Sequence, residues 1–464
     1  MKGFSRAIAA ILLSVLLFSF CVWRYEKLDL ISDATAYLSG ALDRFEQMIV
    51  PFEPHPEDPD TGNGGENQTP SSPYDPNGNY SDYRPGESVN VSVQEALRTG
   101  LLAMQPTIDL SAASATKAEV KNAMASLIYS EPELFYLQSQ YEMTFVGDRV
   151  TALTPKYTCT PSELETKRAE YRAALDAIVA GAPIDGSEFD KILYLHDYFV
   201  ANYTYDTELS IRDAHTLFTQ GKGVCQAYML GLIAAARELG LECTPVTSDT
   251  MMHAWNLVKI DGAWYHVDVT WDDVATLPTQ ACYTYFLQSD AGLTAIDADL
   301  PLVDRHREWA AAVSAQDPTY DQAAFRGAQT PILKQGDVYY CVAAVQDMSG
   351  GVRGEILSGT SITAMAHFAD VRGGYWVAQG NRFYTDCYSD LIVHDGYLYY
   401  HSGNSISRIP LSGGASQTVH LAVGLSGTAS IYGFLGIADG GLQYILADSP
   451  IDTTYRTAVW QMTP

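Results

Sequence analysis

The strongest constraint on the fold is a hairpin signal centred on Asp261-Gly262. This dipeptide is typical of a two-residue turn, and the apolar residues on both sides of it alternate as in antiparallel strands. Pairing outward from the turn sets Trp255 opposite Asp268 and His253 opposite Thr270. Opposite residues share one face of a sheet, so His253 and Asp268 share a face, about 7–8 Å apart along the diagonal. The other face carries side chains suited to a core: Val258, Ile260, Tyr265, Val267 and Val269.

A helix precedes this hairpin. Gly221-Lys222-Gly223 predicts a turn, and the stretch from Val224 to Leu239 predicts a helix that ends at Gly240. Apolar residues recur along it at helical spacing, so we expect it to be buried. Cys225 falls in its first turn, where the helix dipole and unpaired N–H groups favour a thiolate. A cysteine in a buried helix is usually only a small apolar side chain, so this position alone does not decide its role.

Cys225, His253 and Asp268 would form a catalytic triad if the helix packs on the face of the hairpin that carries His253. Asp268 would fix the imidazole through one ring nitrogen and leave the other free to take a proton from the thiol. In other interpretations His253 caps a strand and Asp268 binds a turn, or both join His266 in a metal site. Metal coordination is the weaker interpretation, because a thiol at a helix start fits acyl transfer better.

Two segments, GKGVCQAY and MHAWNLVKIDGAWYHVDVTWDD, resemble the core of the transglutaminase-like superfamily, which has a papain-like fold. The resemblance covers about residues 187–275. It extends more loosely back to about 95 and forward to about 310, through YTYFLQSD and RHREWA. In that family the corresponding cysteine, histidine and aspartate form the triad. The resemblance therefore assigns these roles to Cys225, His253 and Asp268.

The implied reaction is acyl transfer through a thioester, with no cofactor and no metal ion. The Cys225 thiolate attacks an amide or ester carbonyl, and His253 protonates the leaving group. The Cys225 backbone N–H would help to hold the oxyanion. Tyr205 is a weak candidate for the second donor, although an ordinary core or surface tyrosine is the commoner case. Val269 and Gln226 depart from the family pattern, and only Gln226 puts substrate preference in doubt.

The amino terminus predicts a membrane segment. Lys2 and Arg6 precede an apolar run from Ala7 to Trp23, so residues 1–24 form either a signal anchor or a cleaved signal peptide. We favour the anchor, because the run ends in bulky residues where a signal peptidase needs small ones. The bulk of the chain is then extracytoplasmic and membrane-anchored, and it is secreted if the segment is cleaved.

The remaining chain divides by composition, and the predicted fold class is α+β. Residues 51–86 contain eight Pro, five Gly and no Ile, Leu, Val or Met, which predicts disorder. After residue 330, short aromatic runs alternate with turn residues, as in all-β structure. The stretch from Asp395 to Leu411 is similar to a propeller blade, and the region has room for about three blades, so a partial propeller or a sandwich is expected. The predicted regions are a juxtamembrane segment 25–50, an acidic linker 51–90, an N-terminal helical and β extension 91–186, the core 187–315 and a C-terminal β-rich region 330–464.

Local patterns predict several elements and polar contacts. Helices are expected from Val91 to Leu102 and from Lys117 to Tyr129. Strands are expected from Glu133 to Tyr136 and from Tyr141 to Val146. The remaining expectations are capping boxes at Ser162 with Glu165 and at Ser187 with Asp190, a satisfied core histidine at His196 in the following helix, and a solvated turn at Asp272 and Asp273.

Composition narrows the function classes. The chain has 28 Lys+Arg and 55 Asp+Glu, a formal net charge of −27, which argues against a nucleic-acid partner. Seven cysteines without a CxxC pair exclude a zinc ribbon and disfavour a disulfide scaffold. Two functions remain: a thiol enzyme acting on peptide, protein or cell-wall amides, or a non-catalytic cell-surface binding or scaffold protein with the same fold. The oligomeric state is left open.

Overall fold

The computed structural model describes residues 84–464 with gaps at 274–276, 299–304, 329, 347–351, 376–377, 380–381, 384–388, 423–428, 449–453 and 463–464. The predicted membrane segment, the juxtamembrane segment and most of the linker lie outside the described residues. Within the described part of the chain, no helix is long and apolar enough to cross a membrane. The five cysteines described there, Cys159, Cys225, Cys243, Cys282 and Cys341, are free thiols.

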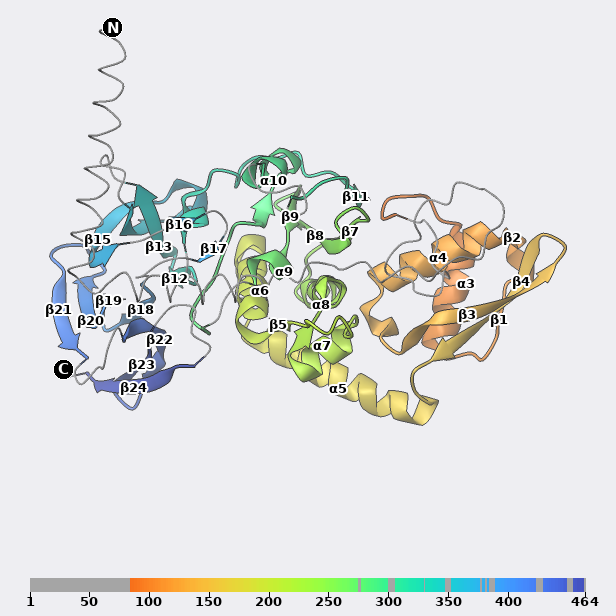
Figure 1. The fold of residues 1–464 in the computed structure, drawn as a ribbon, viewed down its shortest axis with the longest axis horizontal. Coiled ribbons are helices and arrows are strands. Elements are labelled where there is room, and N and C mark those ends of the chain that lie inside the picture. The colour runs from red at the N-terminus through yellow and green to blue at the C-terminus, as the bar shows by residue number, and fades with distance from the viewer. Residues whose placement is uncertain are drawn as a thin grey trace, which may run out of the picture. The chain divides into compact units, whose positions relative to one another are not determined.

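The first described region packs two helices against a small antiparallel sheet (Figure 1). Helices α3 (Val91–Leu102) and α4 (Lys117–Ser130) agree with the predicted helices. The sheet contains β1 (Ile108–Asp109), β2 (Ala115–Thr116), β3 (Leu137–Val146) and β4 (Arg149–Tyr157), with β4 paired to the other three strands. Its core is formed by buried apolar side chains of both helices and of β4.

Two local predictions in this region are wrong. The predicted strand from Glu133 to Tyr136 is instead a 3-10 helix, Pro132–Leu134, followed by a turn, because proline opens a helical turn and cannot donate to a strand ladder. The capping box before α5 (Pro161–Ala180) is formed by Thr160 and Glu163, two residues earlier than expected. Pro161 explains the shift, because proline is favoured at the first helical position and so makes Thr160 the cap.

The central region joins helices to a five-stranded sheet in the order β10-β9-β8-β7-β11. Helix α6 (Glu188–Asn202) begins at the predicted Ser187–Asp190 capping box, and α7 (Ala214–Gln220) leads to the buried helix α8 (Cys225–Glu238). The strands are β7 (Cys243–Ser248), β8 (His253–Ile260), β9 (Ala263–Val267), β10 (Phe286–Gln288) and β11 (Ala310–Ala311). Two short helices complete the region, α9 (Val269–Asp272) and α10 (Asp290–Ile296).

The predicted hairpin is present, with a correction at its end. Asp261 and Gly262 have φ values of 51° and 87°, as a two-residue turn of this kind requires, and Ile260 pairs with Ala263 as predicted. Strand β9 ends at Val267, however, so the expected pairs of Trp255 with Asp268 and of His253 with Thr270 do not form. Asp268 leaves the ladder because its side chain caps α9, accepting hydrogen bonds from two backbone N–H groups.

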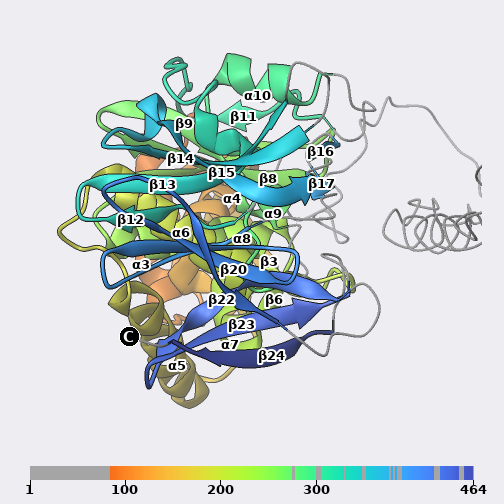
Figure 2. The same ribbon diagram turned by 90° about the vertical axis from the view of Figure 1, so that its left-hand side faces the viewer.

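The C-terminal region is all β, as predicted. Figure 2 turns this part of the molecule toward the viewer. Its first sheet contains β12 (Leu333–Gln335), β13 (Val338–Gln346), β14 (Val352–Gly359) and β15 (Ala366–Tyr375). Strands β18 (Leu391–His394), β19 (Tyr397–Ser402), β20 (Ser405–Pro410) and β21 (Gln417–Leu421) form a four-stranded meander, the arrangement of a propeller blade. The other described strands pair as β16 (Ala378–Gln379) with β17 (Arg382–Phe383), and as β22 (Ser430–Ala438), β23 (Gly441–Ala447) and β24 (Arg456–Gln461).

Candidate active site at the start of helix α8

Cys225 is the first residue of α8 and is 3% exposed. The preceding turn is held by a short parallel pair, β5 (Thr204–Tyr205) with β6 (Lys222–Gly223). Gly223 is needed there, because a β-carbon at this position would lie 2.7 Å from the β-carbon of Ala227. The backbone therefore approaches the helix closely and delivers Cys225 to its first turn, where the helix dipole favours a thiolate.

His253 and Asp268 form a buried hydrogen-bonded pair. His253 Nε2 lies 2.5 Å from Asp268 Oδ2, and the two residues are 6% and 1% exposed. Asp268 Oδ1 accepts hydrogen bonds from the backbone N–H groups of Thr270 and Trp271, both at 3.1 Å. Burial alone would raise the pKa of Asp268, but the His253 charge and hydrogen bond, with further bonds, hold that pKa well below its usual value.

The imidazole of His253 also reaches Cys225. Burial alone would lower the pKa of His253, but the charge of Asp268 and its hydrogen bond, followed by a hydrogen bond with Cys225, raise the pKa to about 10. Because Nε2 is engaged by Asp268, Nδ1 is the ring nitrogen left for the thiol. The structure thus brings Cys225, His253 and Asp268 together.

The helix reaches this site by a different route from the one expected. Helix α8 packs on the face of β8 that carries Asn256, whose Nδ2 donates to the backbone oxygen of Met229 at 3.2 Å, and that face does not carry His253. His253 is the first residue of β8, so its ring lies at the end of the sheet, where α8 also begins. The condition stated from the sequence, that the helix packs on the face that carries His253, is therefore not met, and the contact with the thiol forms at the end of the strand instead.

His306 is part of the same cluster and was missed by the sequence reasoning. Its Nε2 lies 3.0 Å from Asp268 Oδ2, the oxygen that also faces His253. Its Nδ1 lies 3.0 Å from Asp297 Oδ2, which also accepts the His306 backbone N–H at 2.7 Å. The segment RHREWA contains this histidine, but 37 residues separate it from Asp268, and no periodic pattern connects the two.

The metal set considered from sequence is not formed. His266 instead accepts a hydrogen bond from Trp255 Nε1 at 2.9 Å, and its other nitrogen lies 2.9 Å from Asp290 Oδ1. At this site the group that brings three possible ligand atoms within 4.8 Å of one another is His253, Asp268 and His306, and a second such group in the described residues is Glu355, His367 and Asp370. In the first group both imidazoles face the same carboxylate oxygen.

Aromatic rings surround the paired imidazoles. His253 stacks on Trp255 with ring centroids 5.5 Å apart, and Trp271 lies 5.2 Å away. The ring centroid of His306 lies 4.3 Å from that of Trp271 and 4.8 Å from that of Tyr285. Such a shell limits the access of water, which strengthens the interactions between the charges inside it.

The comparisons with known proteins match this part of the chain. The family model described as the transglutaminase-like superfamily matches residues 175–269, which include Cys225, His253 and Asp268. These residues form a transglutaminase-like core.

Two solved structures are among those similar to the chain. One is described as a TGase, with 17% identity and a TM-score of 0.20, covering 29% of this chain and 45% of that one. The other is a candidate cysteine protease from Cytophaga hutchinsonii, with 13% identity and a TM-score of 0.19, covering 28% of this chain and 61% of that one. The chain thus spans about half the length of the solved structures that it matches. No curated protein matches it.

Another buried histidine of the transglutaminase-like core, His196, has a different environment. His196 lies 3.0 Å from Asp197 and 3.3 Å from Asp272, and it is fully buried, in agreement with the core role expected for it. The solvated turn expected at Asp272 and Asp273 is wrong. Asp272 is fully buried and accepts the Tyr285 N–H, while Asp273 accepts a 2.5 Å hydrogen bond from Tyr228. Aromatic side chains enclose this segment, which short-range sequence patterns do not reveal.

Tyr205 lies near the thiol of the transglutaminase-like core. It pairs with Gly223, two residues before Cys225, and it is 42% exposed. Partial burial raises the pKa of Tyr205, and the nearby Cys225 adds to the increase. The phenol is therefore within electrostatic range of the sulfur, at the edge of the site.

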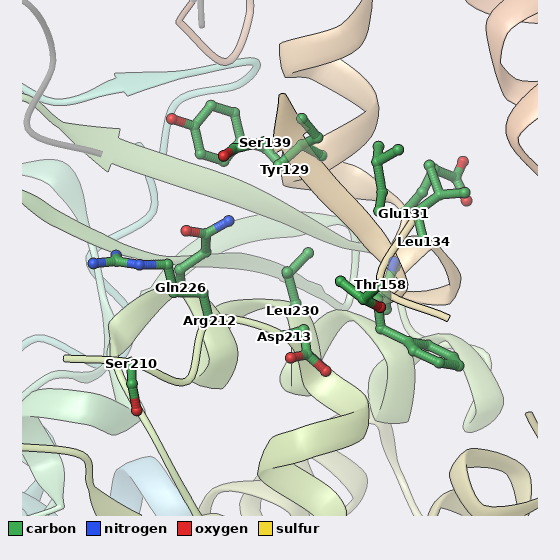
Figure 3. A pocket seen from close by; sticks show the side chains of 14 residues that line it. Tyr129, Glu131, Leu134, Ser139, Thr158, Ser210, Arg212, Asp213, Gln226 and Leu230 are labelled. Carbon is green, nitrogen blue, oxygen red and sulfur yellow. The ribbon is translucent and has the colours of Figure 1, made fainter. Parts of the chain in front are cut away.

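A cleft of about 310 Å³ lies between the N-terminal extension and the transglutaminase-like core, and one of the residues that line it is Gln226, which follows Cys225 in the chain (Figure 3). The core contributes Gln226 and Leu230 of α8 and the Ser210–Asp213 loop, and Ile211 of that loop accepts a hydrogen bond from Val224 N–H at 2.9 Å. The extension supplies the opposite wall: Ile128, Tyr129, Glu131, Pro132, Leu134, Phe135, Leu137, Ser139 and Thr158.

Proposed function

We propose that this chain is a thiol enzyme that cleaves or transfers acyl groups through a Cys225–His253–Asp268 triad. One observation carries the proposal: a buried imidazole lies between a carboxylate and a thiol, and the thiol sits at the start of a helix. An imidazole arranged in this way can take the thiol proton and later return it to a leaving group. The match to the transglutaminase-like superfamily supports this chemistry.

The reaction proceeds in two halves. The Cys225 thiolate attacks the carbonyl carbon of an amide, and the resulting oxyanion accepts hydrogen bonds from the Cys225 N–H and the Tyr205 phenol. Protonated His253 gives its proton to the leaving amine as the C–N bond breaks, which leaves a thioester on the sulfur. Water or a second amine then loses a proton to His253 and attacks the thioester, and the thiolate is released.

The substrate is proposed to be an amide of a peptide, a protein or the cell wall. The cleft that Gln226 lines has walls of mixed character, because Arg212, Glu131 and Gln226 line it together with Leu134 and Leu230. Such a surface suits an extended peptide better than a small apolar ligand. With the predicted segment at residues 1–24, we further propose that the enzyme is membrane-anchored and works outside the cytoplasm.

Mass spectrometry of cell-envelope peptides incubated with the full chain tests this proposal. The wild-type chain should cleave or join amide bonds, and Cys225→Ala should do neither. Cys341→Ala is a matched control, because Cys341 is equally buried, its pKa is raised to about 12 by burial, and it lies in the C-terminal region. If the wild-type and Cys225→Ala chains leave the same products, the chemistry proposed here is wrong. Retention of unaltered peptide by both chains would then favour the binding or scaffold function.

A further inference from the structure

His306 occupies a place between two buried carboxylates. Its two ring nitrogens each lie 3.0 Å from a carboxylate oxygen, one of Asp268 and one of Asp297. All three residues are at most 2% exposed. Each ring nitrogen of His306 therefore has a carboxylate oxygen within hydrogen-bond distance.

The backbone fixes this ring in place. Asp297 Oδ2 accepts hydrogen bonds from both the ring Nδ1 and the backbone N–H of His306, so this side chain and the main chain share one acceptor. On the other side, the ring packs against Trp255, Trp271 and Tyr285, with centroids 4.3–5.0 Å away. Rings and hydrogen bonds together leave His306 little rotational freedom.

Asp268 needs such a partner. Its Oδ1 is already oriented by two backbone N–H groups, and its Oδ2 faces two imidazoles at once. Loss of His306 would favour the protonated form of Asp268, because the hydrogen bond and charge of His306 help to hold the pKa of that carboxyl below its usual value. A protonated Asp268 would no longer hold the proton on His253.

We propose that His306, held by Asp297, is a positioning residue that keeps Asp268 ionised and aimed at His253. The inference rests on the proposed function, because it assigns His306 to the same reaction without contact with the substrate. The full series is then Asp297, His306, Asp268, His253 and Cys225. Each member orients the next, and only His253 and Cys225 take part in proton transfer or attack.

Alkylation of Cys225 by iodoacetamide, followed site by site between pH 5.5 and 9, tests the proposal in the full chain. His306→Gln removes the imidazole ring and keeps one hydrogen-bond donor group. It should slow labelling at pH 6–7 about tenfold, the size usual for loss of a supporting hydrogen-bond partner, and should move the labelling profile up by about one pH unit. Asp297→Asn should act in the same direction and more weakly. His401→Gln, at a buried histidine of β19, should leave labelling unchanged.

A spectroscopic readout separates positioning from folding. The 2.5 Å bond between His253 and Asp268 should give a far-downfield proton resonance, and His306→Gln should shift or broaden it. A folded His306→Gln chain with wild-type labelling and an unmoved resonance would overturn the proposal. If that variant does not fold, Asp297→Asn decides by the same two measurements.

The same experiment distinguishes failure of the proposed function. If wild-type Cys225 labels no faster than Cys341, the triad chemistry fails. The resonance of the His253–Asp268 bond then still reports whether His306 positions the carboxylate. A variant that loses thermal stability but keeps the resonance and the labelling profile shows that His306 has a purely structural role, contrary to the proposal.

Discussion

The transglutaminase-like core and the C-terminal β region each bury a histidine beside an aspartate, with opposite electrostatic results. In the core, His253 has a pKa raised to about 10, and the pKa of Asp268 is held below its usual value. In the β region, burial lowers the pKa of His401 to about 3 and raises that of Asp390 to about 7. The core therefore buries a charged pair, whereas the β region buries two groups that are each driven toward their neutral form.

Hydrogen-bond geometry explains the difference. His253 faces the carboxylate oxygen of Asp268. His401 Nε2 instead accepts a hydrogen bond from the backbone N–H of Asp390 at 3.0 Å, and a nitrogen that accepts a hydrogen bond carries no proton. The Asp390 oxygens accept two other backbone N–H groups. An imidazole is thus held charged in a protein interior where an anion faces it, and at His253 that arrangement occurs next to a thiol.

The largest expected difference between the two regions concerns their cysteines. Cys225→Ala should lower turnover by more than about 1000-fold, since removal of a catalytic nucleophile has effects of this size or greater. Cys341→Ala should leave turnover within about twofold, because Cys341 packs among apolar side chains and its thiol donates to the Met365 sulfur, away from the triad. The measurement is the initial rate on a peptide substrate found by the mass-spectrometric assay. Equal rates for Cys225→Ala and Cys341→Ala would remove the functional distinction between the regions.

The two buried histidines should differ next. His253→Gln should slow alkylation of Cys225 at pH 6 about 100-fold, because the thiolate loses the cation that favours it. In His401→Gln the alkylation rate of Cys225 should equal that of the wild-type chain. Site-resolved alkylation rates on both variants provide the check, and a fast Cys225 in His253→Gln would mean that the imidazole does not activate the sulfur.

A smaller effect is expected for the phenol beside the site. Tyr205→Phe should reduce turnover about tenfold while leaving the alkylation rate of Cys225 unchanged, because an oxyanion donor acts only after attack on a carbonyl. Tyr455→Phe in the β region is the matched control, since Tyr455 is 44% exposed and Tyr205 is 42% exposed. If turnover falls equally in both variants, or falls in neither, Tyr205 is not an oxyanion donor.

The smallest expected effect is on stability, and its sign differs between the regions. His253 binds its proton more tightly in the folded chain, so its stabilisation is complete below its ordinary value near pH 6.5 and is lost as pH rises toward 10. His401 binds its proton more weakly when folded, so stability is lost as pH falls from about 6.5 toward 3.

Urea unfolding between pH 4 and 10 measures both slopes. His253→Gln should flatten the alkaline side and His401→Gln the acid side, each by an amount on the order of 1–3 kcal/mol across its window. His196 contributes to the alkaline slope of every variant, because its pKa is raised to about 9 by Asp197 and Asp272, which outweigh its burial. If the free energy of unfolding depends on pH in the same way in both variants, the two histidines do not differ as described.

Several features followed from short stretches of sequence. The capping box at Ser187, the turn at Asp261-Gly262 and the register around it lie within a few residues, and the structure has them as predicted. The strand expected at Glu133 failed for a local reason, since Pro132 opens a 3-10 turn there. The end of β9 was also mispredicted for a local reason, because the Asp268 side chain caps the helix that follows, α9.

The sequence by itself determined the buried helix that begins at Cys225 and the hairpin that carries His253, because helical and strand periodicities are properties of neighbouring residues. Only the tertiary structure decided on which face α8 packs, how Asp272 is enclosed and which group supports Asp268. His306 and Asp297 reach that carboxylate through contacts between segments far apart in the chain. Such contacts depend on how the whole core packs, and no repeating sequence pattern predicts them.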